Sequence, residues 1–194
     1  MNCKSLTLLL LLLVPALASS LPAASKLKTQ ATLLSEQESI APGQRFSVAL
    51  RFQIAEHWHT YWRNAGDAGL ATKITWDLPP GFVAGEIQWP TPQRLDLGAG
   101  IVNFGYEGDV WHLVEIQAPQ DLKPGQTLTF QARVDWLECE EICQPGQADL
   151  TLKIKSAAES RANPALSAAF QKAAAKSRSG TKPRPFPPPA RAIK

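Results

Sequence analysis

No apolar run in this sequence is long enough to cross a membrane as a helix. The longest, residues 6–14, falls short of the roughly 20 residues that a membrane-spanning helix needs. Lys4 precedes the run, and a small-x-small pattern at residues 16–18 follows it, which is the pattern of a secretory signal peptide. We therefore expect residues 1–18 to be a signal peptide that is cleaved near Ala18, and the remaining chain to be exported and soluble.

Cysteine is scarce in this chain. Of the three cysteines, Cys3 lies before the apolar run and leaves with the expected signal peptide. Cys139 and Cys143 are then the two cysteines of the exported chain, and an exported protein meets conditions that permit a disulfide.

Basic residues are also few in the part of the chain expected to fold. All 17 acidic residues lie between residues 36 and 159, against 12 basic residues between residues 26 and 161, a net charge of −5. The absence of a basic stripe excludes a typical nucleic-acid-binding domain. Seven basic residues and no acid occupy residues 172–194, and residues 177–194 include five prolines. We predict that this last segment is a disordered tail or linker.

Helical periodicity is absent from residue 27 to residue 155, where the pattern is that of β-strands. Apolar residues alternate with polar ones in five segments, residues 45–54, 73–78, 110–116, 128–136 and 148–154. Pro-Gly pairs at residues 42–43, 80–81, 124–125 and 145–146 mark turns. Residues 27–156 are therefore predicted to form an all-β, immunoglobulin-like antiparallel sandwich of seven or eight strands.

One helix is expected after the strands, over residues 162–176. Asn163 can cap it, Pro164 suits the first helical position, and the residues that follow are good helix formers.

The spacing of Cys139 and Cys143 restricts how they can bond. A disulfide needs its two Cα atoms within about 7 Å, whereas four steps of extended strand cover roughly 13 Å. The chain must therefore turn through residues 140–142 if the two cysteines bond. Such a bond would lie at the exposed tip of a strand pair.

Three roles for the cysteine pair remain open on spacing alone. As a staple, a bond that closes so short a loop would contribute only about 2 kcal/mol. A small loop at an exposed tip suits thiol–disulfide exchange, because an attacking thiolate needs access. As a metal site, the two thiolates would join His57 and His59, which we expect on the same side of one strand. His112 is expected to be a surface or packing residue.

Acidic residues before and between the cysteines bear on the direction of electron flow. Glu138, Glu140 and Glu141 disfavour a nearby thiolate and should raise the pKa of both cysteines. The pair would then hold its disulfide firmly and act as a reductant when reduced.

Four stretches of the sequence together resemble one family. They are VDWLECEEICQPGQADLTL at residues 134–152, HWHTYWRNAGDAG at 57–69, QWPTP at 88–92 and FGYEG at 104–108. They resemble the N-terminal periplasmic domain of DsbD-type thiol:disulfide interchange proteins, with the ScsB-like subgroup the most similar. The likeness covers about residues 30–155 and implies an immunoglobulin-like periplasmic domain that needs no cofactor.

The resemblance also implies partners and a chemical role. The electron donor would be a membrane-embedded thiol-transfer protein or a thioredoxin-like domain, and the acceptors would be periplasmic disulfide oxidoreductases. Cys139 and Cys143 match the redox cysteines of the family, and by analogy Cys143 attacks first and Cys139 resolves.

Aromatic residues that shield or flank the cysteines are implied as well. Phe104 matches an aromatic residue of a shielding loop, and Tyr61 and Trp58 match positions beside the pair. The alternative for all three is a place in the core or on a strand face.

Two departures from the family pattern affect the assignment. Better-known members separate their cysteines by five residues rather than three, and this chain carries neither the membrane segments nor the thioredoxin-like domain of full-length members. We expect it to act as a separate subunit or to be a truncated product. The competing functions are a disulfide-stapled binding or assembly module without redox turnover and a metal-binding protein.

Overall fold

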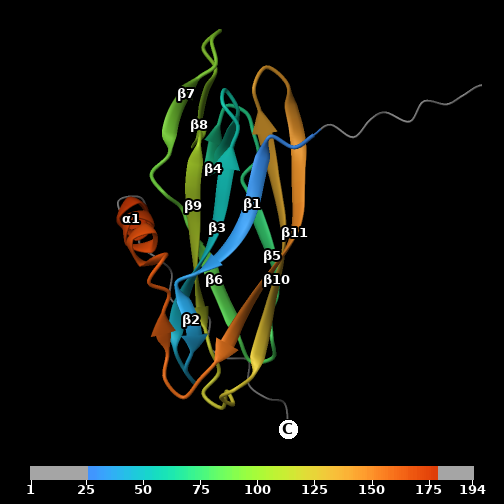
Figure 1. Cartoon of the computed structure of the whole chain (residues 1–194). Helices are drawn as coiled ribbons and strands as arrows, with labels where there is room; N and C mark the ends of the chain where they lie inside the picture. Colours follow the sequence, from blue (N-terminus) through green and yellow to red (C-terminus); the bar gives the residue numbers. More distant parts are fainter. Residues whose placement is uncertain (1–25, 179–194) are drawn as a thin grey trace, which may run out of the picture.

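The computed structural model describes residues 26–178, which form two β-sheets packed face to face with one helix outside them (Figure 1). The first sheet has the order β1 (Thr29–Ser35), β3 (Arg45–Ile54), β9 (Asp109–Gln117), β6 (Val83–Gln88). The second has the order β12 (Arg161–Ala162), β2 (Gln37–Ile40), β11 (Cys143–Ser156), β10 (Thr127–Cys139), β4 (His59–Gly66), β8 (Val102–Tyr106), β7 (Gln93–Asp96). β5 (Lys73–Asp77) pairs with β10 alongside β4.

The predicted all-β sandwich is confirmed, with more strands than expected. The described residues contain twelve strands rather than seven or eight. Several of the additional ones, such as β7 with four residues and β12 with two, are too short to show an alternating pattern. Pairing is antiparallel except between β2 and β11, which makes the second sheet mixed.

Alternation along β3 and β10 builds the core between the sheets. Each strand turns every second residue inward, and these side chains are buried: Phe46, Val48, Leu50, Phe52 and Ile54 from β3, and Leu128, Phe130, Ala132, Val134 and Trp136 from β10. Phe46 meets Phe130 edge to face, with ring centroids 6.0 Å apart. Each large side chain buried here contributes about 1.5–3 kcal/mol, so the two longest patterns in the sequence hold the sheets together.

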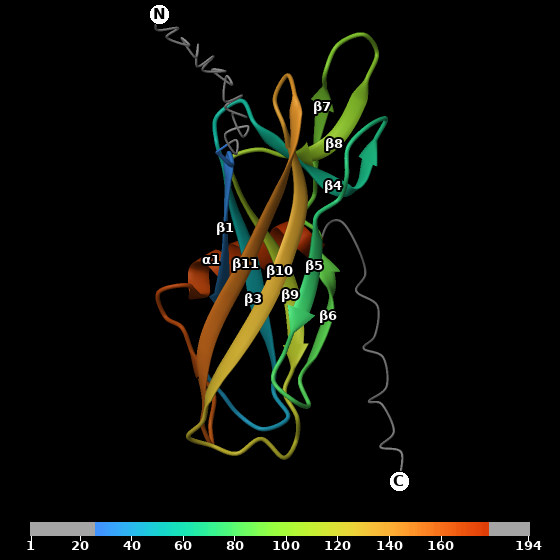
Figure 2. The same ribbon diagram turned by 90° about the vertical axis from the view of Figure 1, so that its right-hand side faces the viewer.

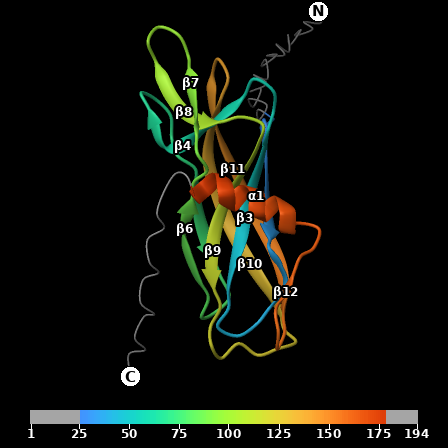
Figure 3. The ribbon, with the colours of Figure 1, turned by 90° about the vertical axis from the view of Figure 1, so that its left-hand side faces the viewer.

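Helix α1 (Ser167–Arg178) lies across the outer face of the first sheet, over β3 and β9 (Figure 3). Phe170 and Ala173 pack on Ala49 and Leu113, whose side chains point away from the core between the sheets. The expected helix was wrong at its start. Residues 161–162 pair with β2 as strand β12, so the chain turns at Asn163, whose carbonyl accepts a hydrogen bond from Ser167 N at 3.0 Å.

Two expectations concern residues that the structure does not describe. The signal peptide of residues 1–18 lies wholly outside residues 26–178, and so does the expected tail beyond Arg178. Within the described part of the chain, no helix has the length and apolar character needed to span a bilayer.

Candidate functional site

Cys139 and Cys143 form a disulfide at the tip of the β10–β11 hairpin. Cys139 ends β10, Cys143 begins β11, and the two residues are direct cross-strand partners with Cα atoms 4.1 Å apart. The turn through residues 140–142, predicted from the cysteine spacing, closes the hairpin, with Glu140 N donating to the Ile142 carbonyl at 3.4 Å. Figure 2 shows this tip at the same end of the sandwich as the β7–β8 hairpin and the end of β4.

The two sulfur-bearing residues differ in access to solvent. Cys143 is exposed, while Cys139 is only 1% exposed. The difference arises because β10 is an inner strand at this point: Cys139 pairs with Cys143 on one side and with His59 of β4 on the other. The expectation of an exposed pair therefore holds for Cys143 and is wrong for Cys139.

Tyr61 of β4 lies against the disulfide. Its hydroxyl donates a hydrogen bond to Cys139 Sγ at 2.9 Å and lies 3.8 Å from Cys143 Sγ. The tyrosine is 1% exposed, and burial raises its pKa, against a smaller lowering by the side chain of Asn103. The hydroxyl therefore keeps its proton at neutral pH and stays a donor to sulfur.

Gly69 holds the ring of Tyr61 in place. A Cβ at this position would come within 2.3 Å of the tyrosine ring, and the φ of +108° is one that residues with side chains rarely adopt. The loop between β4 and β5 thus packs its bare backbone on the ring, and only glycine permits that approach.

His59 completes a line of polar groups behind the disulfide. Its Nε2 lies 3.2 Å from Tyr61 Oη, and the residue is 4% exposed. Burial lowers the pKa of His59, against a smaller opposing effect of the Glu107 charge. His59 is therefore a neutral imidazole at neutral pH, in contact with the group that contacts Cys139.

The metal interpretation relied on a shared strand face for His57 and His59, and that expectation is wrong. His57 lies in the turn before β4 with a φ of +68°. Its side chain is 72% exposed, with Nε2 3.7 Å from Glu56 Oε1, whereas His59 is buried beside Tyr61. The described residues contain no group of three or more histidine, cysteine or acidic side chains placed to hold a metal ion.

Glu138 points to the opposite face of β10 from Cys139. Its carboxylate accepts hydrogen bonds from Lys28 N at 2.8 Å, Trp136 Nε1 at 3.1 Å and Gln144 Nε2 at 2.6 Å. Burial would raise its pKa, but these donors together lower it. Glu138 is therefore an anionic anchor that fixes the start of β1 to the hairpin, rather than a free charge facing the sulfur atoms.

Tyr61 contacts the disulfide directly, whereas the contacts of Phe104 and Trp58 are with other residues. Phe104 of β8 meets Trp62 edge to face, with centroids 6.4 Å apart. Trp62 follows Tyr61 in β4 and so points to the other face of the sheet. Trp58 lies in the turn before β4, with Lys28 Nζ 5.4 Å from its ring centre. The shielding role of Phe104 and the flanking role of Trp58 stay predictions.

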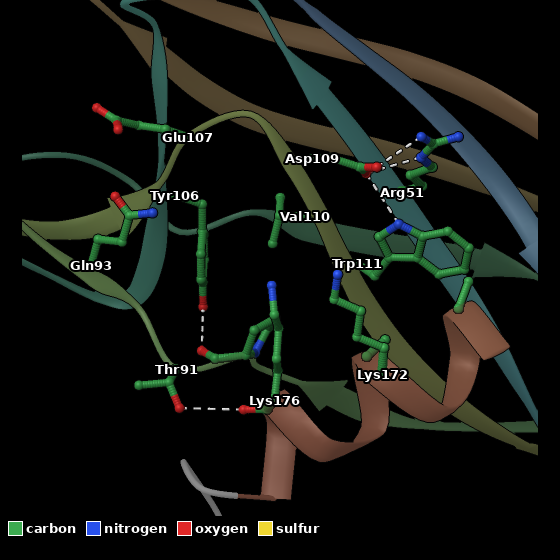
Figure 4. A pocket seen from close by; sticks show the side chains of 13 residues that line it. Arg51, Thr91, Gln93, Tyr106, Glu107, Asp109, Val110, Trp111, Lys172 and Lys176 are labelled. Carbon is green, nitrogen blue, oxygen red and sulfur yellow. Dashed lines mark hydrogen bonds and ion pairs between the residues drawn. The ribbon is translucent and has the colours of Figure 1, made fainter.

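A separate pocket of about 420 Å³ lies between α1 and β9 (Figure 4). Lys172 and Lys176 of the helix line it, together with Arg51, which forms a two-pronged ion pair with Asp109 at 2.8 and 2.9 Å. Thr91 donates to the carbonyl of Lys176 and so ties the end of the helix to the loop after β6. Neither cysteine lines this pocket, so it is not part of the disulfide site.

The fold and the site together define an immunoglobulin-like domain with a disulfide across the tip of a hairpin. The sequence matches the model of the family described as "Thiol:disulfide interchange protein DsbD, N-terminal" over residues 30–155. The chain belongs to this family, as the sequence motifs indicated. Family membership and the Cys139–Cys143 disulfide are the basis of the function proposed below.

Of two similar solved structures, the first agrees with this fold. The N-terminal periplasmic domain of ScsB from Proteus mirabilis is 23% identical, with a TM-score of 0.57, and the match covers 80% of this chain and 57% of that one. The reduced DsbD N-terminal domain of Neisseria meningitidis is 15% identical, with a TM-score of 0.35, over 68% of this chain and 88% of that one. None of the curated proteins compared matches the sequence.

Proposed function

We propose that this protein is a periplasmic thiol–disulfide exchange domain that passes electrons through Cys139 and Cys143 to disulfides of partner proteins. The observation that carries the proposal is the asymmetric site: a disulfide between one exposed and one buried cysteine at the end of the domain. A staple between strands has no need of an exposed sulfur, whereas exchange requires one that an incoming thiolate can reach.

The difference in exposure supports a role for each cysteine. In the reduced domain, the Cys143 thiolate attacks a partner disulfide, forms a mixed disulfide and releases one partner thiolate. The Cys139 thiolate then attacks Cys143 Sγ, which restores the internal disulfide and releases the second partner thiolate. Two electrons leave the domain and no cofactor takes part.

Exposed apolar side chains around the site support a protein as the partner. The large apolar residues that are exposed in the described part of the chain all belong to segments at the disulfide end, namely Leu27, Leu70, Leu97, Ile101 and Ile142. We call these five residues the apolar collar. Hydrogen bonds join the segments that carry them: Gln144 donates to the Lys26 carbonyl, and Val102 N donates to Asp67. We infer that these exposed apolar side chains form part of the surface that contacts a partner protein.

The partners follow from the family rather than from the site. We propose a membrane-embedded thiol-transfer protein or a thioredoxin-like domain as donor and periplasmic disulfide oxidoreductases as acceptors. Export by a signal peptide cleaved near Ala18 would place the domain in that compartment.

The reduction potential of the Cys139–Cys143 pair tests the proposal. After equilibration with glutathione buffers and trapping of free thiols, we expect a potential between about −200 and −270 mV, the range of exchange proteins. Reduction should leave the fold intact, because the bond closes a short loop and contributes only about 2 kcal/mol. A potential below about −300 mV, or unfolding on reduction, would favour the alternative of a stapled binding or assembly module.

The apolar collar can be tested separately from the chemistry. Replacing both Leu97 and Ile101 by Ser should slow reduction of the domain by thioredoxin about tenfold, because the loss of two apolar contacts of about 0.8 kcal/mol or more each weakens the encounter complex. Reduction by glutathione should not change. Lys123→Ser, an exposed change in the turn between β9 and β10, serves as the control, and equal slowing by both reductants would argue against a docking role.

A further inference from the structure

His59, Tyr61 and Cys139 form a chain of polar contacts. An aromatic residue that only flanks the disulfide would not need such a chain. Tyr61 Oη lies 2.9 Å from Cys139 Sγ and 3.2 Å from His59 Nε2. All three residues are buried, with exposed fractions of 1, 1 and 4% for Cys139, Tyr61 and His59. A tyrosine hydroxyl has one proton, so if it donates to sulfur, the contact with His59 must use a proton on Nε2. The hydroxyl is thus held between a donor and an acceptor.

The buried sulfur is the one that needs this arrangement. When an incoming thiolate attacks Cys143 Sγ, the electron pair of the broken bond goes to Cys139 Sγ, which leaves as a thiolate. That charge appears in a buried place, where an uncompensated anion is costly. The Tyr61 hydroxyl is the donor in contact with it, and hydrogen bonds to charged groups are the strong ones.

We propose that His59 and Tyr61 form a proton relay that stabilises and then protonates the Cys139 thiolate as the disulfide opens. This inference rests on the proposed function and adds to it a role for His59. The proton on Nε2 of protonated His59 moves to Tyr61 Oη while the tyrosine proton moves to Cys139 Sγ. The products are neutral His59, Tyr61 with its hydroxyl intact and a Cys139 thiol. Tyr61 touches the reacting sulfur, and His59 acts through it as a positioning residue.

The charges around His59 fit this direction of proton flow. With the disulfide closed, burial keeps the pKa of His59 below its ordinary value, so the imidazole is neutral at neutral pH. The titratable groups that face it are Tyr61 on its own strand, Cys139 on β10, Cys143 beyond Tyr61 on β11, and Glu107 in the turn after β8. A thiolate on Cys139 adds a negative charge to this set and favours proton uptake by His59.

Rates of disulfide opening by glutathione between pH 5 and 8, corrected for the thiolate fraction of glutathione, test the relay. In the unmodified protein the corrected rate should rise as the pH falls toward 5, because burial holds the pKa of His59 below its ordinary value of about 6.5 and the imidazole becomes protonated only at acidic pH. His59→Gln retains a donor for Tyr61 but cannot carry a proton, so its corrected rate should not change with pH. Tyr61→Phe should lower the rate about tenfold or more at every pH, the effect of one hydrogen bond to a charged group.

His57→Gln is the matched control, since it removes an exposed histidine two residues away and should follow the unmodified protein. A His59→Gln profile that coincides with that of the unmodified protein would overturn the relay and leave the exchange function standing. A disulfide that glutathione does not open reversibly would overturn both. If His59→Gln does not fold, as judged by near-ultraviolet circular dichroism, Tyr61→Phe decides: an unchanged rate contradicts the relay.

Discussion

Cys139→Ser is expected to react rapidly with oxidised glutathione and to accumulate as a mixed disulfide at Cys143, whereas Cys143→Ser should remain almost unreacted. The difference follows from access: Cys143 is exposed, while Cys139 is 1% exposed between Cys143 and His59 of the neighbouring strands. Disulfide exchange needs in-line approach of the thiolate to sulfur, so burial blocks the reaction at Cys139. Each variant keeps one thiol, and mass spectrometry at successive times measures how much has reacted.

Unfolding the same two variants provides the control for this comparison. In concentrated urea both thiols are exposed, so the two rates should become similar. Equal rates in the folded state would mean that the fold does not distinguish the cysteines, and the order of attack proposed above would be wrong. Both variants should fold, because a bond across so short a loop contributes only about 2 kcal/mol.

The turn at the cysteines and the strands around it could be predicted from the sequence because both depend on local rules. Four residues of extended chain are too long for a disulfide, which forces a turn at residues 140–142. Residues 45–54 alternate so regularly that the predicted segment coincides with β3. These features depend on residues near in sequence, and the printed sequence shows them.

Strand β4, which carries the site, gave no such signal. Its first three residues, His59, Thr60 and Tyr61, are all buried, because one face packs in the core while the β4–β5 loop covers the other. A strand buried on both faces shows no alternation of apolar and polar residues. Tyr61 was therefore identified through the family resemblance alone, and His59 entered only as a ligand in the metal alternative.

The hydrogen-bond partners of Glu138 could not be predicted from its place beside Cys139 either. Neighbours in a strand point to opposite faces, and the three donors to its carboxylate come from Lys28, Trp136 and Gln144. Lys28 is distant in sequence and reaches the hairpin only because β1 packs there. Acidic residues near a cysteine in sequence are thus a weak guide to the charge that its sulfur experiences.

Acidification is expected to destabilise the folded domain strongly between pH 6.5 and about pH 3, and His112 should account for most of the loss. His112 is fully buried between the rings of Phe52, Trp89 and Tyr106, at centroid distances of 5.6, 5.2 and 5.1 Å. Neither ring nitrogen has a hydrogen-bond partner among the described residues. Of the two places expected for it, on the surface or in the packing of the core, His112 takes the second. Burial lowers its pKa to about 3.

The direction of this pH effect on stability follows from proton binding at His112 in the folded and unfolded states. Between the folded pKa of about 3 and the ordinary value of about 6.5, the unfolded chain binds a proton at His112 and the folded chain does not. Protonation therefore favours unfolding, so the stabilisation is complete above pH 6.5 and is lost as the pH falls. Each unit of pKa difference is worth about 1.4 kcal/mol, so the total loss approaches several kcal/mol, a large part of the stability of an ordinary domain.

Urea unfolding of the unmodified protein and of His112→Leu at a series of pH values measures this effect. The variant removes the two nitrogens and keeps an apolar side chain of similar size, so its stability should change much less from pH 6.5 to pH 4. Below about pH 4 both proteins should lose stability, because Glu138 and Asp109 have lowered pKa values and become protonated there. Parallel stability curves for the two proteins above pH 4 would show that His112 is hydrated or paired in solution. A smaller pH dependence in the variant would instead identify this core histidine as the group that limits the tolerance of the domain to acid.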